Sequence, residues 1–234
     1  MLSCASLNVD RDNVKMEKDK KTRDFKDSAK GRAVCLSPDQ KEVIVGCKDG
    51  TVRVYTFDDR KFEMKFRTLF KHAKEWISDI KTAYNTLIIG SHDNAIYVYD
   101  YEDGEIKRRY KPMRKHSSYI THMDVSRDSC FLQSTCGAYE LLFWALNTGK
   151  KITSGGTMLK NEWWSHWTCN LGWPVQGIYP KCTDGTFINA VDRSHYSVNE
   201  TLQSDDKRSG YVLAAGNDNG KVCLYNFPCT IKSS

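Results

Sequence analysis

Four segments of the chain share one pattern, and this repetition limits the possible folds more than any other feature. Each has an apolar run, a small residue, a polar turn and an alternating stretch that ends in an aromatic residue. Turn residues such as Asp49-Gly50 and Asn219-Gly220 supply the positive φ that tight hairpins need. Val, Ile and Tyr favour strands. The pattern therefore predicts β-hairpins at residues 43–55, 87–100, 131–144 and 212–225.

The aromatic residues that end the hairpins give the repeat length. Tyr55, Tyr99 and Trp144 follow one another at intervals of 44 and 45 residues, and Tyr225 follows after 81. One blade of a WD-type β-propeller has about 40–45 residues. Because the last interval contains no second hairpin of this type, we interpret it as one blade with an insertion. The predicted fold is an all-β WD-repeat β-propeller of about four blades.

The length of the chain limits how many blades it can form. A seven-bladed ring at roughly 40 residues a blade needs more than the 234 residues present. We therefore expect a partial or open ring, or a fragment of a larger tandem propeller. A charged arm at 1–30, either flexible or the remnant of an upstream blade, and a tail at 230–234 are expected to flank it. The predicted blades are 31–70, 71–111, 115–150 and 151–229, with the insertion near 154–195.

The repeats resemble WD repeats but keep their polar residues poorly. In a WD repeat a His, a Ser, an Asp and a Trp form a hydrogen-bonded tetrad. Asp49 and Asp93 occupy the turn position, but Ala138 and Asn219 replace the acid in the other two repeats. Tyr also replaces Trp in three of the four. The fold prediction therefore depends on period and hairpin pattern, and the predicted structural repeat positions are Asp49, Tyr55, Asp93, Tyr99, Trp144 and Tyr225.

The insertion carries the most distinctive residues, including four of the six tryptophans. Its motifs Thr168–Gly172, Val175–Pro180 and Asp184–Ser194, with the ending Gly220–Cys229, resemble the echinoderm microtubule-associated-protein-like family. The resemblance covers about residues 30–229. Phe187 departs from it, because the family usually has an acid there. We interpret the tryptophan cluster as packing the inserted loop onto its host, with a binding platform as the alternative.

The resemblance implies a non-catalytic binding module that associates with microtubules. It implies a cytoplasmic and cytoskeletal location, with the cilium as a further option. Family propellers are preceded by a hydrophobic motif, and many members also have a coiled coil. This sequence shows neither pattern. The alternative is a general protein-interaction scaffold whose partner is not tubulin.

One basic segment is the candidate site for an acidic partner. It has six basic residues and no acid, and it is expected to form an outer strand and the loop after it. Lys and Pro on an edge strand also prevent sheet aggregation, so edge protection is the alternative role. The functional interpretation is an electrostatic patch for the acidic tails of tubulin. The six residues are Lys107, Arg108, Arg109, Lys111, Arg114 and Lys115.

Other function classes find little support in the sequence. The formal net charge of +6 is weaker than that of a dedicated nucleic-acid binder. No apolar stretch approaches the roughly 18 residues of a membrane helix. There is no nucleophile, phosphate-binding or paired metal-ligand motif, and the nine cysteines include no C-x-x-C. We therefore expect no enzyme activity, cofactor, metal, nucleic-acid partner or membrane partner.

Overall fold

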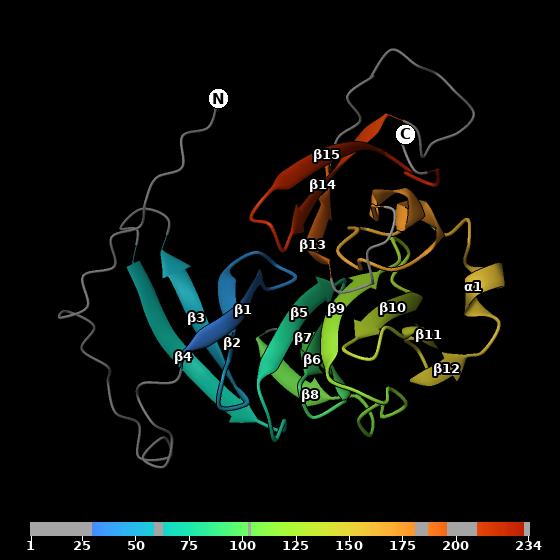
Figure 1. Ribbon diagram of the computed structural model, residues 1–234. Coiled ribbons are helices and arrows are strands. Elements are labelled where there is room, and N and C mark those ends of the chain that lie inside the picture. The colour runs from blue at the N-terminus through green and yellow to red at the C-terminus, as the bar shows by residue number, and fades with distance from the viewer. Residues whose placement is uncertain (1–29, 59–62, 103, 181–186, 196–209, 232–234) are drawn as a thin grey trace.

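The computed structural model describes residues 30–58, 63–102, 104–180, 187–195 and 210–231. Within these ranges, fifteen strands form four antiparallel sheets (Figure 1). The arm predicted for residues 1–30 lies outside the described residues except for Lys30, and the predicted tail is described only as far as Ile231. The blade limits given above stay predictions; the strand bounds of the structure follow.

Each sheet is a meander whose strands pair in chain order, and we number the sheets as blades one to four. Blade one has β1 (Gly31–Leu36), β2 (Glu42–Cys47), β3 (Thr51–Asp58) and β4 (Glu63–Lys71). Blade two has β5 (Ile77–Ala83), β6 (Thr86–Ser91), β7 (Ile96–Glu102) and β8 (Glu105–Arg108). Blade three has β9 (Ile120–Val125), β10 (Phe131–Cys136), β11 (Leu141–Ala145) and β12 (Lys150–Ile152). Blade four has β13 (Ile188–Arg193), β14 (Tyr211–Asn217) and β15 (Val222–Phe227).

Blade four differs from the other three sheets, which have four strands each. Among the described residues it has three strands. The chain between β12 and β13 forms the short helix α1 (Gly155–Met158) and the 3-10 helix η1 (Trp173–Ile178). Figure 1 shows this insertion beside blades three and four. The insertion therefore occupies space next to blade four without completing its sheet.

The four hairpin turns have the same backbone conformation, which confirms the repeat. One residue in each turn has a positive φ, and it lies five positions before the terminal aromatic residue. These residues are Gly50 (81°), Asn94 (62°), Tyr139 (60°) and Gly220 (69°). A non-glycine residue in this conformation costs on the order of 1 kcal/mol, so Tyr139 must be held by its surroundings.

Consecutive blades stack through a glycine on the second strand. The inner strands β1, β5 and β9 lie side by side (Figure 1). A Cβ at Gly46 would lie 2.3 Å from Ile77 Cγ2 in blade two, and one at Gly90 would lie 2.7 Å from Ile120 Cγ2 in blade three. Both isoleucines are fully buried. The missing side chain thus lets the isoleucine of the next blade fill the space between the sheets.

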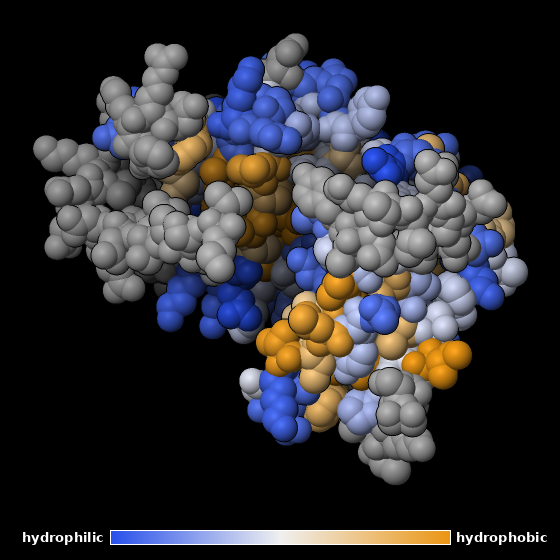
Figure 2. All heavy atoms as spheres, turned by 90° about the horizontal axis from the view of Figure 1, so that it is seen from above, coloured by the Kyte–Doolittle hydropathy of each residue, from blue (hydrophilic) through white to orange (hydrophobic). Residues whose placement is uncertain are grey.

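Burial follows from how many faces of a sheet are covered. Every residue of β6 in blade two is buried, because blades one and three cover both faces. Val34 of β1 is 67% exposed, and Val222 and Leu224 of β15 are 72% and 70% exposed. From above, apolar side chains gather in patches separated by hydrophilic surface (Figure 2). The described sheets do not close into a ring, which confirms the prediction of a partial propeller.

The stacking glycines make a direct test of this packing. We expect Gly46→Ala to lower the free energy of unfolding by about 1–3 kcal/mol, because a close-packed interface has no room for the added methyl group. The matched control is Gly216→Ala, where the nearest atom to an added Cβ is 4.0 Å away. Urea unfolding of both variants measures the difference. Equal stability of the two would contradict the stacking described here.

Candidate partner-binding site

The predicted basic segment runs along the outer edge of blade two. The backbone N–H of Arg109 donates to the carbonyl of Val98 at 2.9 Å, and Met113 forms an antiparallel bridge with Ile96. The segment therefore continues the line of β8 beside β7 before it reaches blade three. Its side chains then divide into two groups with different surroundings.

Two of the six predicted residues are used inside the fold. Arg109 donates from Nε to Asp100 Oδ1 at 2.6 Å and from Nη2 to Thr86 Oγ1 at 2.8 Å. Arg114 donates from Nη1 to the carbonyl oxygen of Asp93 at 2.7 Å and from Nη2 to its carboxylate at 3.3 Å. Their donors fix the edge of blade two, so neither side chain is available to a partner without breaking these contacts.

The other four predicted residues are exposed. Lys107 Nζ lies 2.6 Å from Glu105 Oε2 on the same strand. Among the described residues, no ion pair involves Arg108, Lys111 or Lys115. The binding role of the six residues stays a prediction. Arg108, Lys111 and Lys115 are the exposed basic residues of the segment that form no ion pair within the described part of the chain.

Blade three contains a complete hydrogen-bonded network that includes Trp144, one of the predicted repeat positions. Ser134 Oγ accepts from Trp144 Nε1 at 2.8 Å and lies 2.7 Å from His116 Nε2. His116 Nδ1 lies 3.3 Å from Glu140 Oε2, which also accepts from the backbone N–H of Ser117 at 2.9 Å. Glu140 thus takes the place of the turn acid that Ala138 replaces. The sequence has Ala138 at the turn position, and its pattern did not predict that the acid two positions later reaches the histidine.

The network sets the charge state of its members. The hydrogen bond from the Ser117 N–H lowers the pKa of Glu140 to about 2, and burial lowers the pKa of His116. Glu140 is therefore a carboxylate and His116 a neutral ring at neutral pH. The neutral ring donates from Nδ1 to the carboxylate and accepts the Ser134 hydroxyl proton at Nε2.

The other repeat positions keep only parts of this network. In blade two, His72 Nδ1 lies 3.0 Å from the Tyr99 hydroxyl, and Asp93 Oδ2 accepts from the backbone N–H of Lys74 at 3.1 Å. In blade one, Asp49 accepts from Thr51, and Tyr55 packs edge-on against Phe66 with ring centroids 5.8 Å apart. In blade four, the Tyr225 hydroxyl donates to the carbonyl of Ile178 at 3.4 Å. The assignment of these residues as structural repeat positions stays a prediction beside these contacts.

One group of potential metal ligands lies within this network. His116, Cys136 and Glu140 are the one cluster of three such side chains in the described part of the chain, with ligand atoms within 4.8 Å of one another. Cys136 Sγ already donates to Glu140 Oε2 at 3.2 Å. Burial raises the pKa of Cys136, so its thiol keeps its proton. We assign the cluster to the hydrogen-bonded core of the blade.

The insertion is anchored by one buried carboxylate that the sequence analysis missed. Asp124 of β9 is fully buried and accepts from the backbone N–H groups of Thr168 and Cys169, both at 2.9 Å. It also accepts from Thr168 Oγ1 at 2.9 Å and from Gln133 Nε2 at 3.2 Å. The backbone N–H of Ser165 donates to the carbonyl of Val125 at 2.8 Å. The inserted loop is thereby fixed against the inner strand of blade three.

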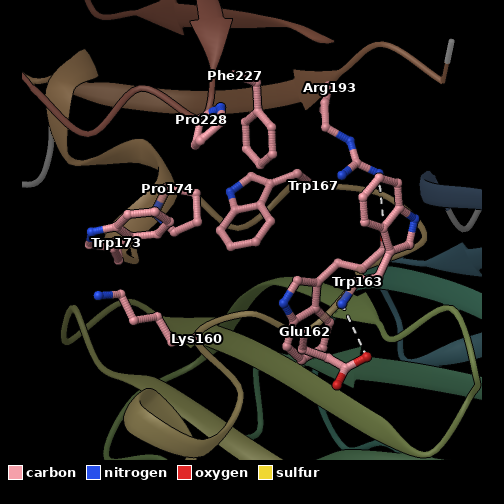
Figure 3. A pocket seen from close by; sticks show the side chains of 10 residues that line it. Lys160, Glu162, Trp163, Trp167, Trp173, Pro174, Arg193, Phe227 and Pro228 are labelled. Atoms are coloured by element: carbon pink, nitrogen blue, oxygen red, sulfur yellow. Dashed lines mark hydrogen bonds between the residues drawn. The ribbon is translucent and has the colours of Figure 1, made fainter. Parts of the chain in front are cut away.

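The tryptophans of the insertion fill the space between blades three and four. Trp164 and Trp167 are 3% and 4% exposed and belong to one apolar cluster with residues of both blades. This confirms the packing role predicted for these two rings. Trp163 and Trp173 are only partly buried, and together with Trp167 and Arg193 they line a pocket (Figure 3).

Comparison with known proteins agrees with this architecture. A family model described as the echinoderm microtubule-associated protein second beta-propeller matches residues 13–234. The chain belongs to this family. Echinoderm microtubule-associated protein-like 2 of Rattus norvegicus is 42% identical over 113 residues, which are 48% of this chain and 15% of that protein. Echinoderm microtubule-associated protein-like 1 of Homo sapiens is 41% identical over 114 residues, 49% of this chain and 12% of that protein.

The aligned part of this family member thus spans less than a sixth of these relatives. The β-propeller domain of Cps50 (Swd1) from Myceliophteria thermophila has a TM-score of 0.49 and 11% identity, and covers 84% of this chain and 54% of that one. The family assignment does not depend on that likeness. Among the described residues, no helix has the length and apolar character to cross a bilayer.

The anchor of the insertion can be tested by an isosteric change. We expect Asp124→Asn to lower the free energy of unfolding by about 2–3 kcal/mol, because the amide cannot accept from all of the donors that face the carboxylate. Urea unfolding measures the loss, and limited proteolysis should cut residues 161–180 faster. The control is Asp128→Asn, whose carboxylate makes only local bonds to Ser126 and Cys130. Equal losses in the two variants would contradict a special role for Asp124.

The blade-three network predicts a pH-dependent stability. Because the folded-state pKa of Glu140 lies below its ordinary value of 4.5, its contribution is complete above that pH. It is lost as the pH falls from there toward about 2. We expect the wild type to be more stable than Glu140→Gln at neutral pH, with a gap that narrows between about pH 5 and about pH 3. Urea unfolding at several pH values measures the gap, and a constant gap would oppose this assignment.

Proposed function

We propose that this chain is a non-catalytic binding module that contributes to the association of its protein with microtubules. The observation that carries the proposal is the family match over residues 13–234, together with relatives whose names state microtubule association. The exposed basic residues of blade two support an acidic partner such as tubulin. We propose a cytoplasmic and cytoskeletal location for the same reason.

The charges of blade two that the fold does not use are suited to a weak, salt-dependent contact. Arg108, Lys111 and Lys115 are exposed, and each such contact is worth about 0.2–1 kcal/mol. Several must therefore act together. Electrostatic attraction of this kind raises the rate of association and weakens with salt. The proposed contact is therefore electrostatic and weak, and stable binding needs further contacts beside it.

The state of the cysteine thiols supports a non-catalytic role. Burial raises the pKa of Cys35 to about 12 and also raises the pKa of Cys47, Cys169 and Cys229. A thiol acts as a nucleophile through its thiolate, which these environments disfavour at neutral pH. These four thiols, all within the described residues, are therefore packing groups.

The rings of one aromatic stack near the surface are already in contact with other groups. His92 stacks between Trp76 and Tyr119, with ring centroids 5.1 and 4.5 Å apart. Lys48 Nζ also lies 4.5 Å from the ring centroid of Trp76, and Tyr119 packs on the backbone at Gly137. Single-strand sites need open ring faces for the bases. We therefore keep a protein partner as the proposal.

Co-sedimentation with stabilised microtubules at low salt tests the proposed function. We expect Lys111→Glu combined with Lys115→Glu to weaken binding by about three- to tenfold, from two exposed contacts reversed in charge. Lys41→Glu combined with Lys65→Glu makes the same charge change on blade one and should bind like the wild type. Wild-type binding should also fall as salt is raised.

Two outcomes would count against this proposal. Failure of the folded wild-type chain to co-sediment at low salt would oppose a microtubule contact in this part of the protein. Affinity capture of another protein without tubulin would favour the general scaffold instead. Equal weakening by the blade-one and blade-two variants would show that net charge, and not the blade-two edge, governs binding.

A further inference from the structure

Two buried hydrogen-bond donors in the insertion pocket are unpaired among the residues that the structure describes. Trp167 Nε1 and Arg193 Nε are buried, and neither has a hydrogen-bond partner among the described residues. Trp167 is 4% exposed and Arg193 is 7% exposed. Both side chains line the same pocket (Figure 3). Because leaving a buried donor unpaired costs about 1–3 kcal/mol, two in one pocket point to an occupant that accepts hydrogen bonds.

The rest of the Arg193 guanidinium is fixed in place. Its Nη2 donates to the carbonyls of Trp164 and Ser165 at 2.9 and 3.3 Å. Its Cζ lies 5.0 Å from the ring centroid of Tyr211 and 5.3 Å from that of Phe227. These contacts hold the side chain in one orientation. The unpaired Nε–H is therefore part of a rigid group and does not reach another acceptor by rotating.

The pocket favours negative charge. Lys160 and Arg193 lie on opposite sides of Trp167 (Figure 3), and Lys160 Nζ is 4.8 Å from the ring centroid of Trp173. Glu162 is the one acid that lines the pocket, and its Oε1 accepts from the backbone N–H of Trp163 at 3.1 Å. The pocket thus has two cationic side chains, one acidic side chain and two unpaired donors. This combination favours an anionic group that accepts hydrogen bonds.

The size of the pocket limits how much of a ligand can enter. Its cavity volume of about 20 Å³ exceeds the roughly 10–15 Å³ that one water molecule needs, so a small head group can enter it. A carboxylate head is planar and carries two acceptor oxygens, whereas an aromatic ring is too large for this space. The aromatic and proline side chains around the entrance can pack against the methylene groups that carry such a head.

We propose that this pocket binds a glutamate or aspartate side chain from an acidic peptide segment of a partner protein. The inference deepens the proposed function and rests on it, because it supplies a specific contact for an acidic partner beside the non-specific lysines of blade two. The carboxylate accepts from Trp167 Nε1 and Arg193 Nε, and the charge of Lys160 attracts it to the pocket.

The direct test uses the full chain and a synthetic peptide of ten glutamates. In nitrogen-15 NMR spectra, we expect the Trp167 Nε1–H and Arg193 Nε–H resonances to shift as the peptide is added. The matched peptide of ten glutamines should leave them in place. The Trp144 Nε1–H, which already donates to Ser134, serves as the internal reference that does not move.

A pair of variants measures the contribution of the indole donor. Trp167→Phe keeps an aromatic ring but removes the N–H, and we expect it to weaken binding of a labelled ten-glutamate peptide about tenfold, since the lost bond is charge-assisted. Trp76→Phe, which changes a tryptophan outside the pocket, should bind within about twofold of the wild type. Fluorescence anisotropy measures both, and the NMR spectra show whether each variant is folded.

The outcomes separate this proposal from the microtubule contact. Shifts confined to the surface lysines, or equal responses to glutamine and glutamate peptides, would overturn the pocket proposal and indicate that water alone fills it. If Trp167→Phe binds microtubules normally while the blade-two lysine variant does not, the pocket proposal is overturned and the proposed function stands. If the pocket resonances respond to the peptide but the wild type does not bind microtubules, the pocket stands and its partner is another acidic protein.

Discussion

The close packing of one sheet on the next is the constraint on which the structure depends. A four-stranded sheet with apolar residues on both faces has no stable form in water on its own. Gly46 and Gly90 leave the space into which Ile77 and Ile120 fit, so that blades one, two and three form one continuous core. Blade two, covered on both sides, has the most deeply buried strands. The end sheets keep exposed apolar faces because each lacks a neighbour on one side.

The junction between blades three and four is packed by different residues from those between the first three blades. At the position equivalent to the stacking glycines, blade three has Thr135, and the insertion stands between the two sheets. Trp164 and Trp167 supply the apolar volume there. Asp124 fixes the position of the inserted loop, because a buried carboxylate is stable only when several hydrogen-bond donors surround it. Polar anchoring thus replaces direct stacking where an extra segment must be accommodated.

The groups that the fold does not use are the ones available for function. Arg109 and Arg114 are basic, yet their donors are occupied by acids and carbonyls of blade two. Lys111 and Lys115 lie in the same segment and have no such partners among the described residues. Next to the insertion, Arg193 Nε is an unpaired donor within the described part of the chain, whereas Nη2 of the same guanidinium donates to the carbonyl of Trp164. Counting basic residues along the chain cannot make this distinction.

Local patterns in the sequence determined the strands, the turns and the period of the fold. Alternation of side chains, turn residues with positive φ and equal spacing act over a few neighbouring positions, so they can be read along the chain. Only the tertiary structure decided that Glu140 completes the blade-three network and that Asp124 anchors a loop 44 residues away. It also brought Trp167 and Arg193 to one pocket. These contacts join residues far apart in sequence, and the residue types at each end have no local pattern that marks the partner.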